Sequence, residues 1–143
     1  PGTTGANGVD RKALGAAVLG DRDKVAKLES IIHPAVGTMR AAFLKDHADD
    51  EMILFDVPLL FEKGGDKSVD VIVVVSAPAH MQRERVLARP GMTPERFEQI
   101  LALQMNDADK RARADHVIDS GQNLQETRQQ VRELVKSLRA GLA

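Results

Sequence analysis

The chain has 143 residues, 20 basic and 21 acidic side chains, a formal net charge of −1 and no cysteine. Its length suits one ordinary domain, and the missing cysteine excludes disulfides, thiolate metal sites and cysteine nucleophiles within the sequence. The near-zero charge and the lack of Tyr and Trp argue against a nucleic-acid partner. No apolar run approaches the ~20 residues of a membrane span and no secretory pattern is visible, so we expect no membrane partner and a cytoplasmic location.

The first part of the chain predicts three helices and no strand. Residues 1–9 are small and Gly-rich, which indicates a loop. Asp10 and Asp21 each precede apolar residues at helical spacing, so both are expected to be N-caps. Pro34 is expected to interrupt the second helix and to begin a third, since a proline disfavours helical backbone in the residue before it.

Three apolar runs predict β-strands farther along the chain. Met52–Val57 is apolar except for Asp56, as in a strand buried on both faces, and Val69–Ser76 is almost wholly β-branched. A short third strand is expected over Asp115–Ile118. Helices are predicted between and after the last two strands, beginning near Ala77-Pro78, Thr93-Pro94, Asn106 or Asp107, and Asn123. Strands alternating with helices indicate an α/β fold with a parallel sheet.

Asp56 is the first candidate for chemistry, because ligands of open parallel sheets bind beyond the carboxyl ends of the strands. A carboxylate within an apolar run is costly to bury unless it is paired or faces a cation. Asp56 could bind a magnesium-bound water or act as a general base near a phosphoryl acceptor. The alternative is that it caps the turn at Pro58.

Two further groups of polar residues are candidates. Arg85 and Arg89 are four residues apart, so on one helix they share a face and could clamp phosphate oxygens, although a solvated face is the alternative. The loop Asp119–Asn123 could present backbone groups to a base or ribose, or simply connect a strand to a helix. Gly65–Ser68 is not a phosphate loop, because Asp66 stands where a Walker A motif needs glycine.

Four motifs occur in a fixed order: His33-Pro34, Asp56–Glu62 (DVPLLFE), Glu98–Gln104 and Ala114–Asp119. Together with two arginines before a Thr-Pro-capped helix, they closely resemble dephospho-CoA kinases. The resemblance implies transfer of the γ-phosphate of ATP to the ribose 3′-hydroxyl of dephospho-CoA, the last step of coenzyme A synthesis. It also implies that magnesium accompanies the ATP.

The same resemblance implies an α/β fold of a known kind. We expect a P-loop kinase-like parallel sheet with helices on both faces, a helical CoA-binding subdomain and a lid, with N-terminal strands missing from this chain. Residues 9–48 would form the helical substrate-binding subdomain, and residues 81–113 the lid region. The core would comprise residues 49–80 and 114–143.

The resemblance further implies roles for single residues. Arg85 and Arg89 would be catalytic residues that face the ATP phosphates or the adenine plane, and Asp56 would lie near the acceptor ribose or, through water, near magnesium. The residues expected beside the adenine are Asp119, Ser120, Gly121 and Gln122. On the dephospho-CoA side we expect His33 and Arg40.

The sequence also departs from the family. Dephospho-CoA kinases begin with a strand, a Gly-rich Walker A loop and an Asp-x-Asp, and none of these occurs in the 143 residues. We therefore expect a segment to precede Pro1 and little kinase activity from this chain alone. Two alternatives stay open: another P-loop small-molecule kinase, such as a nucleoside monophosphate kinase, or a non-catalytic α/β binding module.

Overall fold

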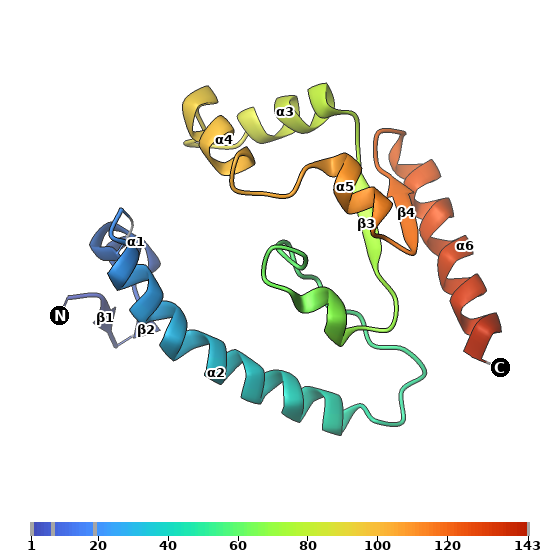
Figure 1. The fold of residues 1–143 in the computed structure, drawn as a ribbon, viewed down its shortest axis with the longest axis horizontal. Coiled ribbons are helices and arrows are strands. Elements are labelled where there is room, and N and C mark those ends of the chain that lie inside the picture. Colours follow the sequence, from blue (N-terminus) through green and yellow to red (C-terminus); the bar gives the residue numbers. More distant parts are fainter. Residues whose placement is uncertain (1, 7, 19, 143) are drawn as a thin grey trace. The chain divides into compact units, whose positions relative to one another are not determined.

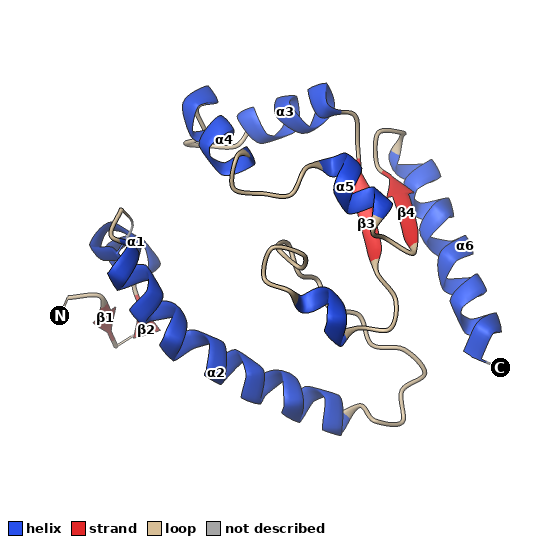
Figure 2. Cartoon of the chain, in the orientation of Figure 1, coloured by secondary structure: helices blue, strands red, loops and turns tan. Residues whose placement is uncertain are grey.

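A computed structural model describes residues 2–6, 8–18 and 20–142 of the chain. The structure divides into two compact units, Pro1–Ile53 and Leu54–Ala143. Figure 1 follows the chain through its elements, and Figure 2 colours the helices blue and the strands red. Within the described ranges, no helix combines the length and the apolar character needed to cross a membrane.

The first unit begins with a hairpin and continues into two helices. Strands β1 (Thr4–Gly5) and β2 (Gly8–Val9) pair antiparallel, so the predicted loop is wrong at these four residues. Two-residue strands carry no alternation of apolar and polar residues, and a sequence pattern therefore cannot show them. Helices α1 (Arg11–Val18) and α2 (Arg22–Asp46) follow.

Both predicted N-caps of the first unit are confirmed. Asp10 Oδ1 accepts hydrogen bonds from the backbone N–H groups of Lys12 and Ala13, at 2.9 and 3.0 Å. Asp21 Oδ1 accepts from the N–H groups two and three residues later, both at 3.1 Å. Each carboxylate thus satisfies N–H groups that have no partner within the first turn of its helix.

The predicted break at Pro34 is wrong, because α2 is one helix of 25 residues with Pro34 inside it. The first unit therefore has two helices among its described residues rather than three. A proline removes only one N–H from the helical ladder, and the residues on either side keep theirs. The side chains around Pro34 are exposed, so water can solvate the carbonyl of Ser30 that loses its donor.

The apolar run at the boundary between the two units is not a strand. Residues 52–57 have no regular secondary structure, and Leu54 is 85% exposed, so the predicted first strand is wrong. A strand is defined by its hydrogen-bonded neighbour, and no described residue pairs with this run. Turns lead from Pro58 to a short 3-10 helix, η1 (Gly65–Ser68), with Gly64 in the left-handed region at φ 68°.

The predicted parallel pairing is confirmed for the other two strands. β3 (Val73–Ser76) and β4 (His116–Asp119) pair in parallel, with Val73 opposite His116 and Ser76 opposite Asp119. The crossover between them consists of helices α3 (Ala79–Leu87), α4 (Pro94–Leu101) and α5 (Asp107–Ala112). Helix α5 packs against β3, and α6 (Leu124–Leu142) packs against β4.

Side-chain caps begin three of these helices as the sequence predicts. Thr93 Oγ1 accepts from the N–H of Arg96, Asn106 Oδ1 from that of Asp109, and Asn123 Oδ1 from that of Glu126. The apolar core is small: among the described residues, the buried apolar side chains are Phe61, Val74, Ala77 and Ile118. Polar contacts must therefore fix much of the geometry of the second unit.

Replacing Pro34 with alanine should stabilise α2. The substitution restores an N–H to the helical ladder and removes the proline ring, and an interior proline costs up to about 3 kcal/mol relative to alanine. We expect Pro34→Ala to raise the free energy of unfolding in urea. Pro90→Ala is the control, because Pro90 lies in a turn and has no helical bond to restore. Equal effects of the two substitutions would contradict this account.

Candidate functional site

The candidate site lies where the two parallel strands end. Ser76 is the last residue of β3 and is opposite Asp119, the last residue of β4. The next residue, Ser120, donates two hydrogen bonds to the carbonyl of Ser76, from its N–H at 2.7 Å and from its Oγ at 2.9 Å. The loop after β4 is therefore fastened to the end of β3.

The four residues predicted to lie beside adenine form one ordered turn. Asp119 Oδ1 accepts from the N–H of Gly121 at 2.7 Å, and Asp119 Oδ2 accepts from Gln122 Nε2 at 3.3 Å. Gln130 of α6 bonds to the backbone of Asp119 on both sides, its Oε1 accepting from the N–H at 2.9 Å and its Nε2 donating to the carbonyl at 3.0 Å. Helix α6 thus holds the loop from one side.

Gly121 is required by space rather than by backbone conformation. A Cβ at this position would lie 2.6 Å from Cδ of Pro78 and 2.9 Å from Oδ1 of Asp119. Contacts this short force their neighbours to move, and a proline ring has little freedom to do so. Only glycine lets the loop approach the start of α3 this closely.

Arg85 joins helix α3 to this loop. Its Nη2 donates to the carbonyl of Ser120 at 2.9 Å, across 35 positions of sequence. Arg89 does not share its helix face, because α3 ends at Leu87. Pro90 disfavours helical backbone at Arg89, and Gly91 turns the chain with φ 76°, so the predicted common face is wrong. The structure shows Arg89 exposed in this turn.

A cavity of about 360 Å³ opens at the same end of the sheet. This volume lies at the lower end of the range for small-molecule sites. Its lining combines the ends of both strands with the start of α3 and one face of α5: Ser76, Ala77, Pro78, Ala79, Asp107, Arg111, Val117 and Asp119. Ser76 Oγ donates within it to both carboxylate oxygens of Asp107, at 2.8 Å each.

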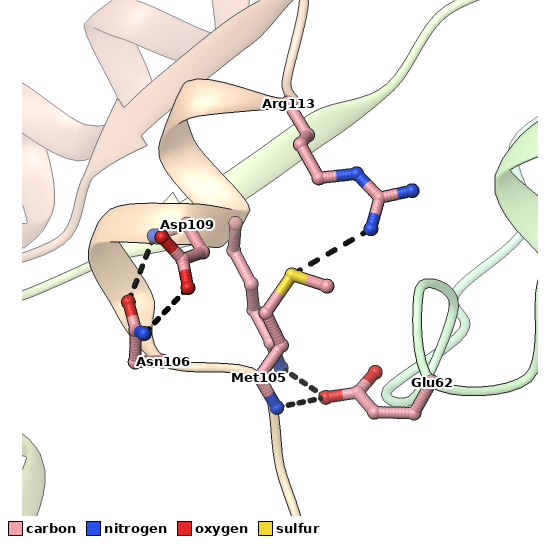
Figure 3. Close-up of polar contacts among 6 residues, drawn as sticks. Glu62, Met105, Asn106, Asp109 and Arg113 are labelled. Carbon is pink, nitrogen blue, oxygen red and sulfur yellow. Dashed lines mark hydrogen bonds and ion pairs between the residues drawn. The ribbon is translucent and has the colours of Figure 1, made fainter.

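A second polar cluster ties the DVPLLFE motif to the start of α5 (Figure 3). Glu62 Oε1 accepts from the N–H of Met105 at 2.8 Å and lies 3.1 Å from Nζ of Lys110. The side chains of Glu62 and Lys110 are only 15% and 18% exposed. Nearby, the guanidinium of Arg113 pairs with Asp66 at 2.6 Å and lies over the ring of Phe61, 4.6 Å from its centre.

Glu62 is the titratable group most affected by this cluster. Burial alone raises the pKa of its carboxyl, but the N–H groups of Glu62 and Met105 and the Lys110 ammonium outweigh that effect. The pKa of Glu62 is consequently held below its ordinary value. Its second oxygen, Oε2, is buried and has no hydrogen-bond partner, so the ionised carboxylate depends on contacts to one oxygen.

The other predicted site residues belong to other segments of the chain. Asp56 is exposed and has no regular secondary structure around it. His33 and Arg40 both lie on α2 of the first unit, seven residues apart and hence on one helix face. No group of three or more His, Asp or Glu side chains that could hold a metal ion occurs among the described residues.

Sequence reasoning missed the polar contacts that hold the site. Asp107 was predicted only as a possible helix start, and the interactions of Glu62 and Lys110 were not predicted. Glu62 carried one signal, since it is the charged residue that closes an apolar motif, where burial demands a partner. Its partner Lys110 is 48 positions away, a pairing that no local pattern encodes.

Comparison with known proteins now identifies the family. A family model described as "Dephospho-CoA kinase" matches residues 4–126. The dephospho-CoA kinase of Novosphingobium aromaticivorans is 59% identical over 139 residues, which are 97% of this chain and 69% of that protein. That of Mesorhizobium japonicum is 50% identical over 141 residues, covering 97% of this chain and 72% of that protein.

This chain belongs to the dephospho-CoA kinase family. Family membership makes it a kinase, as its motifs predict, and assigns it to the step that converts dephospho-CoA to coenzyme A. Solved structures support the same fold. TT1252 from Thermus thermophilus matches with a TM-score of 0.73 and 28% identity, over 95% of this chain and 71% of that one. The dephospho-CoA kinase of Campylobacter jejuni, with a TM-score of 0.68 and 22% identity, shares the fold. The expected P-loop kinase fold is therefore confirmed.

The lowered pKa of Glu62 predicts a specific acid sensitivity. Because the folded state binds this proton more weakly than the unfolded state does, the stabilisation is complete above the ordinary carboxyl pKa of 4.5. It is lost as the pH falls through the folded-state pKa. We expect Glu62→Gln to lower the free energy of unfolding at neutral pH, and the difference from the wild type to shrink as the pH falls below about 5.

Urea unfolding at a series of pH values measures this difference. Glu133→Gln is the matched control, since Glu133 lies on the exposed face of α6 and accepts a hydrogen bond from Gln129 of the same helix. A gap between wild type and Glu62→Gln that stays constant from pH 7 to below the folded-state pKa would contradict the assignment.

Proposed function

We propose that residues 54–143 provide the lid and nucleotide-loop side of a site that transfers the γ-phosphoryl group of ATP to the ribose 3′-hydroxyl of dephospho-CoA. In this transfer a bond forms between the 3′-oxygen and the γ-phosphorus while the bond from that phosphorus to the β–γ bridging oxygen breaks. The observation that carries the proposal is the contact of Arg85 with the Ser120 carbonyl. It joins the arginine-bearing region to the loop at the carboxyl end of the parallel strands.

Arg85 is suited to bind ATP because one hydrogen bond uses only part of its guanidinium. The group carries five N–H donors, and the Ser120 carbonyl takes one of them. The remaining donors and the planar face are available for phosphate oxygens or for the adenine ring. Arg89, which follows α3 by two residues, is proposed to contact the phosphates as the second arginine of the lid region, residues 81–113.

The loop Asp119–Gln122 is proposed to hold the adenine. These 143 residues include no Tyr or Trp to stack on a base, so if they hold the adenine, an arginine plane or apolar side chains supply the stacking, beside the backbone groups of the loop. The hydrogen bonds within the turn and those from Gln130 keep its backbone fixed. A fixed loop binds its ligand without the entropy cost of ordering.

Asp56 is proposed to lie near the acceptor ribose or, through water, near the magnesium that accompanies ATP. Magnesium bound to nucleotide phosphates keeps several waters and needs only one or two protein carboxylates. A single exposed carboxylate fits this requirement, and a cluster of protein ligands is not needed. When bound, the ion offsets the negative charge of the phosphates, while Asp56 would hold one of its waters or accept the proton of the 3′-hydroxyl.

The helical part, residues 9–48, is proposed to bind dephospho-CoA, with residues 49–80 and 114–143 as the core. His33 and Arg40 share one face of α2, where a cation and an imidazole suit a phosphate-bearing substrate. Because ATP and dephospho-CoA are metabolites of the cell interior, we propose that the protein acts in the cytoplasm.

Loss of Arg85 should impair catalysis more than folding. In the protein expressed from its complete gene, we expect Arg85→Ala to lower kcat by about 100-fold or more, since charge-stabilising donors in active sites contribute effects of this size. A coupled assay with ATP and dephospho-CoA measures it. Arg132→Ala is the control, because the guanidinium of Arg132 is exposed and donates to Oε1 of Gln129 on its own helix. Unchanged kcat in Arg85→Ala would contradict the proposal.

Gly121→Ala should weaken ATP binding. The new Cβ would collide with Pro78 and push the loop away from α3, so we expect KM for ATP to rise by about tenfold, equivalent to about 1.4 kcal/mol. KM for dephospho-CoA should change little. Gly141→Ala has open space around its Cβ and is the control. If both Michaelis constants rise equally, the loop does not bind ATP selectively.

A further inference from the structure

Helix α5 is a short element held by polar contacts of two of its residues, Asp107 and Lys110. It has six residues, none of them buried, and packs against β3. The mostly buried carboxylate of Glu62 binds Nζ of Lys110 and the N–H of Met105, just before the helix. Three residues before Lys110, the Asp107 carboxylate accepts the hydroxyl of Ser76 with both oxygens.

Asp107 is connected through Ser76 to the loop Asp119–Gln122. The hydroxyl of Ser76 is bound to Asp107, and the carbonyl of the same residue accepts the N–H and Oγ of Ser120 at 2.7 and 2.9 Å. The carbonyl of Ser120 in turn accepts from Arg85 at 2.9 Å. Gln82, one turn before Arg85, also donates to the carbonyl of Ala77 at 2.7 Å and reaches Asp107 at 3.4 Å.

We propose that Asp107 and Lys110 are positioning residues for the phosphoryl transfer. Lys110 binds α5 to Glu62 of the DVPLLFE motif, and Asp107 binds α5 to Ser76 at the end of β3. Together they fix the positions of Ser120 and Arg85 relative to the motif that contains Asp56. The inference rests on the proposed function, in which Arg85 contacts ATP. The inference assigns a role to Asp107 and Lys110, which contact neither ATP nor dephospho-CoA in the proposed function.

The chemistry of the two contacts supports a positioning role. An ion pair that is mostly withdrawn from water has few alternative geometries, because each charge loses its compensation when the pair separates. A hydroxyl bound by both oxygens of one carboxylate is likewise restricted in rotation. With only four buried apolar side chains among the described residues, packing alone does not fix α5. Small displacements matter here, since a misplacement of about 1 Å can cost 100-fold in rate.

A double-mutant cycle with Arg85 tests the proposal in the protein expressed from its complete gene. We expect Asp107→Ala and Lys110→Met each to lower kcat by about 10-fold or more in the wild-type background. In the Arg85→Ala background, each should lower kcat by less than about threefold, because the group that they position is already gone. Asp107→Asn keeps an oxygen that can accept the Ser76 hydroxyl and should recover most of the lost kcat.

Val135→Ala on α6 is the matched control for stability, and all assays run well below the melting temperature of every variant. Its effect on kcat should be small and the same in both backgrounds. Equal fold-losses for Asp107→Ala with and without Arg85 would overturn the inference and leave the proposed function standing. Wild-type kcat in Arg85→Ala alone would overturn both. If Lys110→Met fails to fold, the cycle between Asp107 and Arg85 decides the question.

Discussion

The carbonyl of Ser76 is the point on which the site depends. It accepts two hydrogen bonds from Ser120, while the hydroxyl of the same residue is bound to Asp107. One buried serine thereby joins the end of β3, the loop after β4 and helix α5. Parallel strands bring their carboxyl ends to one edge, but the pairing of four residues with four does not fix a loop beyond it. The strand register brings Ser76 and Asp119 to one edge, and the hydrogen bonds of Ser76 then fix the position of the loop.

A small apolar core explains why so much geometry is polar. The described residues bury four apolar side chains and none of them completely, so shape complementarity can specify little. Hydrogen bonds contribute modestly to net stability but are directional, and losing one partner of a buried pair is costly. A directional hydrogen bond to the Ser120 carbonyl holds the guanidinium of Arg85 in one orientation. Glu62 is sensitive to the loss of either partner for the same reason, because only its Oε1 contacts Met105 and Lys110.

Sequence predicted the local features of the fold and missed the long-range ones. The N-caps at Asp10, Asp21 and Thr93 were predictable because a cap is formed by residues two or three positions apart. The break at Pro34 was wrong because a preference against helix at one residue does not outweigh the bonds of its neighbours. The strand at residues 52–57 was wrong for a different reason: composition indicates burial, whereas a strand also needs a pairing partner. The motifs identified the family because they span separate parts of the chain in order.

The DVPLLFE motif contains two carboxylates in different environments, one exposed and one mostly buried. Asp56 at its start is exposed, as a carboxylate must be if it is to meet a substrate or a hydrated ion, while Glu62 at its end is mostly buried and ionised. The five residues between them include Pro58 and the buried Phe61, which stiffen the connection and pack it under the guanidinium of Arg113. The exposed carboxylate of Asp56, for which we propose a role in the reaction, thus belongs to a segment that is anchored by its other carboxylate, Glu62. Because that anchor leads through Lys110 and α5 to Ser76, the acceptor side and the arginine side of the proposed site belong to one connected set of contacts.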